Sequence, residues 1–163
     1  MRLSSITFYL KRPDIAIRKL IFKYQVWRNP NEPWLVKAAI RYCDKVLTKD
    51  MTVFEWGSGR STAWFAQRSK KVISIEYNKD WFDKVTNDLS DKNIDNVDFH
   101  YVALEHEYKA PTKPKYEKAP KYVAAIDEHS NVDMVIVDGH YRRACVLQCL
   151  DRIKPGGHIL IDD

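Results

Sequence analysis

Glycine, cysteine and long apolar runs are all scarce in this chain of 163 residues. Its 3 cysteines show neither the even count of a disulfide scaffold nor the paired spacing of a zinc site. No apolar stretch approaches the roughly 20 residues that a membrane-spanning helix requires, and no signal-peptide cleavage site follows the N-terminus. The mean hydropathy of -0.48 agrees with these absences. We therefore predict a globular protein of the cytoplasm.

The positive charge of the chain is concentrated near its N-terminus. The net charge is +5 at pH 7, and residues 1–28 contain seven basic side chains against a single acid, Asp14. This pattern predicts a basic helical segment over residues 1–32, followed by the main domain over residues 33–163. Peripheral contact with an anionic membrane surface is one hypothesis for the basic segment, and packing on its own domain or on a partner subunit is another. Nucleic acid is disfavoured as a partner, because no zinc-finger spacing or aromatic ribonucleoprotein motif is present.

Short apolar runs alternate with helical patterns along the main domain. Strands are predicted at 51–56, 72–77, 97–104, 132–139 and 158–162, and helices at 34–47, 61–69, 79–91, 122–128 and 144–153. A polar insert with three prolines, residues 105–121, is predicted to form a long loop. Strands that alternate with helices form parallel sheets through right-handed crossovers. We therefore predict an α/β fold with a doubly wound, mainly parallel, Rossmann-like sheet of at least five strands in the order 3-2-1-4-5.

The carboxyl ends of these strands are the first place to look for a functional site. In doubly wound sheets, ligands bind beyond these ends, where the winding of the chain reverses. The residues that stand where the five apolar runs stop, at or just before the predicted strand ends, are Glu55, Glu76, Leu104, Asp138 and Asp162.

Two of the 5 glycines stand close together in the stretch VFEWGSGRST, residues 53–62. Gly57 and Gly59 follow a predicted buried strand and precede a helix, so the backbone can turn tightly there and approach a ligand. The N–H groups at the start of that helix favour a carboxylate or a phosphate. Glu76 lies 21 residues after Glu55, at the end of the second strand, where an acid can hold ribose hydroxyls. The combination predicts a cofactor that contains a nucleoside.

Two features of the turn separate the candidate cofactors. A dinucleotide fingerprint requires a third glycine, and Thr62 stands at that position. Glu55 would repel a pyrophosphate, whereas it can accept a hydrogen bond from an ammonium group. S-adenosylmethionine (SAM) carries an amine, a carboxylate, a ribose and an adenine, and it therefore matches both ends of the predicted site.

From about residue 33 to residue 163 the chain resembles the class I SAM-dependent methyltransferases. The resemblance rests on the glycine turn, the acid after the second strand, Asp-Gly after the fourth strand and Pro-Gly-Gly before the fifth. Domains of this family usually continue beyond the fifth strand, so we expect a fragment, a reduced fold, or a homo-oligomer in which another chain covers the edge of that strand. The resemblance also implies that Glu76 holds the ribose and that the rest of the cofactor is bound by Glu55, Gly57, Ser58, Gly59 and Ser61.

Residues that follow the fourth strand are the candidates for catalysis. Asp138 is expected beside the methyl group of the cofactor, and His140 is the general-base candidate because imidazole titrates near neutral pH. Asp138, Asp162 and Asp163 together provide oxygen ligands that suit Mg²⁺ or another divalent cation. The arrangement is similar to that of catechol-type O-methyltransferases, although Asp-Asp replaces their Asp-Asn pair. The alternative is that Asp138 orients substrate or caps the next helix and that the terminal aspartates are solvated.

The sequence thus predicts a SAM-dependent methyltransferase that acts on a hydroxyl group of a small molecule or a glycan. One alternative is an NAD(P)-dependent oxidoreductase, which Thr62 and Glu55 disfavour. The other alternative is a non-catalytic module that binds the cofactor or a partner without turnover.

Overall fold

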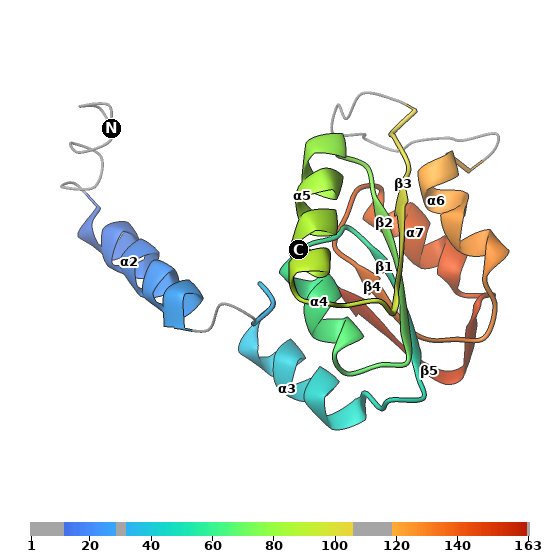
Figure 1. The fold of residues 1–163 in the computed structure, drawn as a ribbon, viewed down its shortest axis with the longest axis horizontal. Coiled ribbons are helices and arrows are strands. Elements are labelled where there is room, and N and C mark those ends of the chain that lie inside the picture. Colours follow the sequence, from blue (N-terminus) through green and yellow to red (C-terminus); the bar gives the residue numbers. More distant parts are fainter. Residues whose placement is uncertain (1–11, 29–31, 106–118, 163) are drawn as a thin grey trace. The chain divides into compact units, whose positions relative to one another are not determined.

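The computed structural model describes residues 12–28, 32–105 and 119–162. Residues 106–118, which make up most of the predicted long loop, and Asp163 lie outside the described residues. The chain divides into two units, residues 1–32 and 33–163, which Figure 1 colours along the sequence. The functions that the sequence suggests for these two segments stay predictions.

The first unit contains one described helix, α2 (Pro13–Arg28). Four apolar side chains recur along it at helical spacing and are between 50% and 66% exposed: Ile17, Leu20, Ile21 and Tyr24. Peripheral membrane contact through this basic segment stays a prediction. None of the helices within the described ranges combines the length and the apolar character that crossing a bilayer requires.

The second unit is a five-stranded parallel sheet with helices on both faces (Figure 1). The strand order is β3-β2-β1-β4-β5, so the winding reverses between β1 and β4. This arrangement confirms the predicted fold class. Its elements in chain order are α3 (Lys37–Val46), β1 (Thr52–Trp56), α4 (Arg60–Ala66), β2 (Lys71–Glu76), α5 (Lys79–Asp91), β3 (Val97–Tyr101), α6 (Lys121–Ala124), the 3-10 helix η1 (Ala125–Glu128), β4 (Val132–Val137), α7 (Arg142–Cys149) and β5 (Ile153–Ile161).

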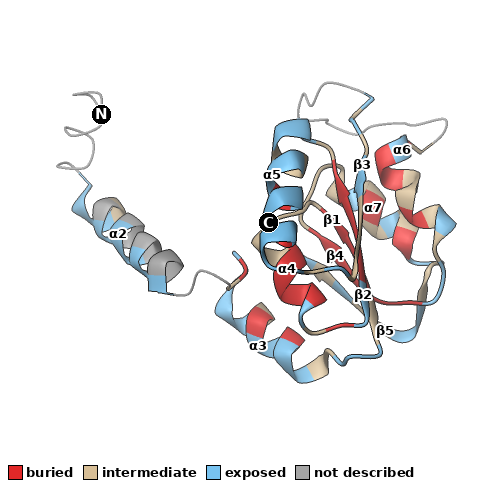
Figure 2. Cartoon of the chain, viewed as in Figure 1, coloured by how far each residue is buried: buried red, intermediate tan, exposed pale blue. Residues whose placement is uncertain are grey.

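The three central strands are buried on both faces, as parallel strands between two helical layers should be (Figure 2). Side chains along β1 alternate between the two layers. Phe54 and Trp56 belong to a core that also contains residues of α6, η1 and α7, whereas Val53 packs with residues of α3 and α4. Because of this alternation, Glu55 lies on the same face of β1 as Val53, the face that α4 covers.

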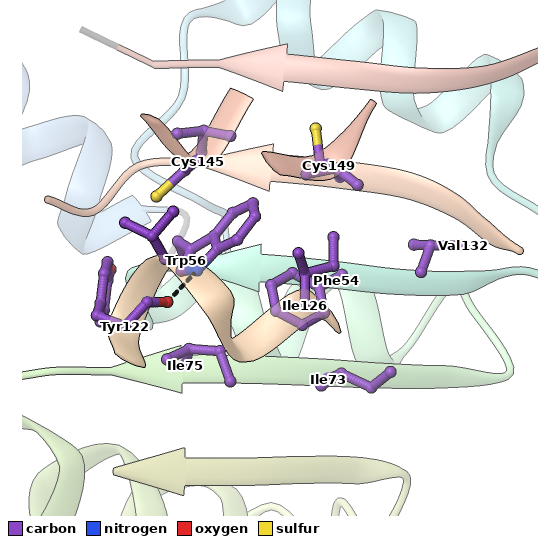
Figure 3. Packing of buried hydrophobic residues seen from close by; sticks show 12 residues of the cluster. Phe54, Trp56, Ile73, Ile75, Tyr122, Ile126, Val132, Cys145 and Cys149 are labelled. Carbon is purple, nitrogen blue, oxygen red and sulfur yellow. Dashed lines mark hydrogen bonds between the residues drawn. The ribbon is translucent and has the colours of Figure 1, made fainter. Parts of the chain in front are cut away.

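A buried hydrogen bond links the end of β1 to α6 within this core (Figure 3). The indole Nε1 of Trp56 donates to the carbonyl oxygen of Tyr122 at 2.8 Å. Cys145 and Cys149, one helical turn apart on α7, are free thiols buried in the same cluster. Both cysteines therefore act as small apolar side chains of the core.

The predicted boundary between the last helix and the last strand was wrong. The helix was expected to continue to residue 153 and the strand to begin at 158, but α7 ends at Cys149 and β5 begins at Ile153. The strand accommodates Pro155 because it lies at the edge of the described sheet and because its pairing with β4 shifts register between Val132 and Met134. Gly156, with a φ of +81°, supplies the backbone conformation that this irregularity needs. A homo-oligomer that covers the edge of β5 stays a prediction.

Candidate cofactor-binding and active site

The carboxyl ends of β1 and β4 approach each other so closely that side chains cannot fit between them. Gly57 follows β1 with a φ of +91°, and a Cβ atom there would lie 2.7 Å from the carbonyl oxygen of Asp138. A Cβ atom on Gly139 would lie 3.1 Å from the backbone nitrogen of Gly57 and would overlap the hydroxyl group of Tyr122. The packing of the protein itself therefore requires both glycines at the point where the winding reverses.

Gly59 has no such requirement. Its φ of 161° is extended, and the atoms nearest to an added Cβ belong to Trp81, 3.8 Å away. Its N–H donates to Oγ1 of Thr62 at 2.9 Å, and α4 begins directly after it. Among the described residues nothing sterically demands a glycine here, and the close approach of a ligand to Gly59 stays a prediction.

The carboxylate of Glu76 ties the glycine turn to the end of β2. It is 3% exposed. Its Oε2 accepts hydrogen bonds from the N–H and the hydroxyl of Ser58 at 3.1 and 2.8 Å. Its Oε1 accepts from the N–H groups of Tyr77 and Asn78 at 2.9 and 2.8 Å. A ribose hydroxyl that binds Glu76 must therefore share one of these two oxygens with the donors already present, or displace the hydroxyl of Ser58.

Glu55 lies beneath the turn and is fully buried. Its Oε1 accepts from the hydroxyl of Ser74 at 2.8 Å and its Oε2 from the hydroxyl of Ser61 at 3.3 Å, while Thr62 is a third hydroxyl partner. Burial raises the pKa of Glu55 to about 7, against the lowering effect of these hydroxyl groups, and the charge of Asp138 adds to the increase. Hydroxyl groups contact both oxygens of Glu55, so any effect of Glu55 on a ligand above the turn depends on how far this carboxyl is ionised.

Trp81, in the first turn of α5, contacts the glycine turn that follows β1. Its indole Nε1 donates to the carbonyl oxygen of Ser58 at 2.8 Å. The helix begins at this point because the side chain of Asn78 caps it, accepting a hydrogen bond from the N–H of Trp81 at 3.0 Å. The same cap that starts α5 therefore also positions the indole against the turn.

Arg142 joins the carboxyl ends of β4 and β5. Its guanidinium donates to the carbonyl oxygen of Gly139 at 3.1 Å and to the carbonyl oxygen of Asp162, and its Nη2 lies 3.5 Å from Oδ1 of Asp138. Burial raises the pKa of Asp138, the charge of Asp162 raises it further, and Arg142 lowers it. The two predicted acids are thus close enough to influence each other, and a guanidinium contacts both residues.

The imidazole of His140 stacks on the ring of Tyr77. The ring centroids are 4.3 Å apart and the planes are 21° from parallel. Since Tyr77 follows β2 and His140 follows β4, the pair bridges the ends of the two strands that flank β1. Burial lowers the pKa of His140, the charge of Arg142 lowers it further, and Glu76 raises it. The ring is therefore neutral at neutral pH, the form that accepts a proton.

A family model described as a methyltransferase domain matches residues 54–163, from within β1 to the end of the chain. The chain belongs to this methyltransferase family. The family and the fold support SAM as the cofactor over a dinucleotide. No curated protein matched the sequence.

Solved structures share the fold of this methyltransferase domain. A methyltransferase-like protein from Silicibacter pomeroyi aligns with a TM-score of 0.64 and 22% identity, over 81% of this chain and 73% of that chain. A proposed methyltransferase from Streptococcus mutans, crystallised with S-adenosylhomocysteine (SAH), aligns with a TM-score of 0.59 and 14% identity, over 80% and 72%. An rRNA methylase from Streptococcus thermophilus aligns with a TM-score of 0.56 and 19% identity, over 79% and 74%. At these identities the likeness shows the fold alone.

Two observations at the turn fit the cofactor of the family. The space that a Cβ atom on Gly59 would occupy is left free by the described residues, since the nearest atoms, those of Trp81, lie 3.8 Å away. One guanidinium nitrogen of Arg60, Nη1, is enclosed and has no hydrogen-bond partner among the described residues, and an anion is the partner it lacks. The roles of the predicted binding residues stay predictions, but all of them lie at this turn or under it.

The described residues at the ends of β4 and β5 give no support to a site for a divalent cation. Within the described ranges, no group of three or more His, Cys, Asp or Glu side chains could hold a metal ion. Asp163, the third predicted ligand, lies outside them. The guanidinium of Arg142 already supplies positive charge to Asp138 and to the carbonyl of Asp162. The predicted metal site therefore gains no support.

Three residues at the site were missed by the sequence analysis. Arg60 stands inside the glycine motif, Trp81 in the first turn of a helix that begins right after Glu76, and Tyr77 directly after that acid. Adjacency to a predicted ligand-binding residue was the available signal for all three. Only the structure shows their contacts.

Proposed function

We propose that the protein transfers the methyl group of SAM to a hydroxyl group of a small molecule or a glycan, with His140 as the general base. The observation that carries the proposal is the position of the His140 imidazole, which follows β4 and stacks on Tyr77 with ring centroids 4.3 Å apart. Burial and Arg142 lower the pKa of this ring, which favours its neutral form. A hydroxyl group needs a base because it must lose its proton as it becomes a methyl ether. An acceptor atom that carries no proton needs no such base.

The chemistry requires alignment and one proton acceptor. When bound, the cofactor supplies a methyl group whose carbon–sulfur bond breaks with its electron pair remaining on sulfur. As the acceptor oxygen forms its bond to this methyl carbon, a ring nitrogen of His140 takes the proton of the hydroxyl group. Stacking on Tyr77 restricts the orientation of the imidazole, and in this proposal Asp138 orients the acceptor.

The proposed function competes with two alternatives. The fold is shared with an rRNA methylase at 19% identity, so the fold by itself does not choose between a hydroxyl of a small molecule and a nucleic acid. The chain could also bind the cofactor without turnover, as the sequence analysis allowed. A test of the proposal must therefore separate binding from transfer and must compare acceptor classes.

The test combines calorimetry with SAH and transfer of labelled methyl from SAM to panels of phenols, sugars and RNA. We expect saturable SAH binding and transfer to members of a hydroxyl panel. His140→Gln should lower kcat by roughly 100-fold or more, the usual contribution of a general base, with a much smaller change in SAH affinity. His158→Gln is the matched control, because His158 contacts Tyr42 on α3, at 2.8 Å, rather than the site.

Several outcomes would contradict this proposal. Transfer to RNA alone would overturn the acceptor class, and saturable binding of NAD without SAH would overturn the cofactor. Equal losses of kcat in the two histidine variants would remove the base role of His140.

A further inference from the structure

Arg60 carries an unusual guanidinium group. It is the first residue of α4, directly after the glycine turn. Its Nη1 is buried but has no hydrogen-bond partner, and Arg60 forms no ion pair with any described residue. An enclosed charged donor without a partner is costly in a folded protein, so such a group calls for a specific explanation.

The guanidinium is held in place by an aromatic ring instead of by an acid. The Cζ atom of Arg60 lies 5.5 Å from the ring centroid of Trp34, within the range of a cation–π contact. Trp34 belongs to the segment that precedes α3, and the neighbouring Pro33 is buried. Contact with a ring face restricts the plane of a guanidinium and does not use the N–H groups at its edge, which are the groups that bind an anion.

A second arginine near the same helix shows what a structural arginine does here. Arg68, just beyond α4, lies 3.8 Å from the ring centroid of Trp64. Its Nε donates to Asp44 at 2.8 Å and its Nη1 to the carbonyl oxygen of Trp64 at 3.2 Å. The two arginines share a tryptophan contact, but of the two only Arg68 has guanidinium donors that other described residues accept.

The charges around the turn suit a zwitterion. Glu55 lies buried on the sheet side of the turn, and no ion pair connects it to Arg60 among the described residues. A guanidinium therefore flanks the same turn as two acids, Glu76 and the partly ionised Glu55, and no ion pair links it to either of them among the described residues. An α-amino acid, with an ammonium and a carboxylate on one carbon, has the complementary charges.

We propose that Arg60 binds the carboxylate of the amino-acid part of the cofactor through its Nη1 edge, with Trp34 holding the guanidinium in place. This inference rests on SAM being the cofactor. The hydroxyl of Ser61, one of the cofactor-binding residues that the resemblance implies, donates to Glu55 at 3.3 Å.

The test uses two probes that differ by one group, SAH and its decarboxylated analogue, in calorimetry with the full chain. Wild-type protein should bind SAH more tightly than the analogue by roughly 10-fold or more, as for a charge-assisted hydrogen bond. Arg60→Gln should lose about that factor for SAH and change the affinity for the analogue by less than about 2-fold. Arg60→Lys keeps the charge but loses the planar fork, so its affinity for SAH should lie between those of wild type and Arg60→Gln.

Arg68→Gln is the matched control and should leave the ratio of the two affinities unchanged. Equal losses for both probes in Arg60→Gln, with a folded variant by circular dichroism, would overturn the carboxylate assignment and leave the cofactor intact. Should Arg60→Gln not fold, the same ratio measured in Arg60→Lys decides the question. Failure of wild-type protein to bind either probe would overturn the cofactor itself, and the inference with it.

Discussion

Ser58 donates two hydrogen bonds to a single oxygen of Glu76, one from its backbone N–H at 3.1 Å and one from its hydroxyl at 2.8 Å. The acid that the sequence assigns to ribose is therefore also the anchor of the turn. These two roles make different predictions for substitutions at the two positions.

Glu76→Ala should weaken SAH binding by about 1–3 kcal/mol, the scale of losing a partner to buried polar groups. It should also lower the thermal midpoint, because four donors lose their acceptor. Ser58→Ala, in contrast, frees a lone pair on Glu76 and should retain or improve SAH affinity. Calorimetry and thermal melting of both variants check this. Equal loss of affinity in the two variants would indicate that Glu76 acts only through the turn.

Substitution by alanine should affect stability very differently at the two glycines of the turn. Gly57→Ala places a Cβ atom 2.7 Å from a backbone oxygen at a φ of +91°, so it should destabilise the fold by more than about 2 kcal/mol. Gly59→Ala meets only ordinary contacts in the protein and should keep its stability within about 1 kcal/mol of wild type. If a ligand approaches Gly59 closely, SAH affinity falls in this stable variant. Unchanged affinity would show that the ligand lies elsewhere.

The buried carboxyl of Glu55 should make stability depend on pH. Its folded pKa of about 7 lies above the ordinary value of 4.5, so its contribution is complete below about pH 4.5 and is lost as the pH rises towards 7. A difference of that size corresponds to about 3 kcal/mol of unfolding free energy. Urea unfolding of wild type and Glu55→Gln over this range should show a difference in unfolding free energy between the two proteins that changes with pH. Glu128→Gln, at an exposed position, is the control, and a constant difference for Glu55→Gln would contradict the prediction.

Removal of the Arg142 charge should leave two acids facing each other. In Arg142→Gln the pKa of Asp138 should rise further, because burial and Asp162 raise it and Arg142 alone lowers it. The stability lost relative to wild type should therefore grow as the pH rises through the carboxyl range, which thermal melts at several pH values can follow. Mg²⁺ should raise the midpoint of the variant and leave that of wild type unchanged. A specific Mg²⁺ effect on wild type would instead support the predicted metal site, and Arg143→Gln, the exposed neighbour, is the control.

The order of elements was predictable because the signals for it are local. Apolar runs such as VISI and MVIV identify buried strands, and the glycine turn marks the strand–helix junction at the end of β1. Boundaries failed where tertiary pairing overrides local chemistry. Lys154-Pro155-Gly156-Gly157 reads as a stop between elements, yet it lies inside β5 because an edge strand tolerates a proline and a change of register.

The site was predictable as a set of positions but not as a set of contacts. Periodicity and strand ends are enough to place Glu55, Glu76 and Asp138 at one edge of a parallel sheet. They do not show that the oxygens of Glu76 are taken by Ser58, because hydrogen bonding depends on distances of a few tenths of an ångström. Arg60 and Trp81 were missed for the same reason, since each acquires its role from a partner far along the chain.

What the sequence alone determined is the doubly wound sheet and the edge where its cofactor should bind, because residue pattern and turn chemistry act over a few neighbouring positions. What only the tertiary structure decided is the electrostatics of that edge: a carboxyl of Glu55 that titrates near neutrality, a His140 imidazole that stacks on Tyr77 and has a lowered pKa, and an enclosed Nη1 of Arg60 with no hydrogen-bond partner among the described residues. Burial and charge proximity set these properties, and both depend on segments that meet only when the chain folds.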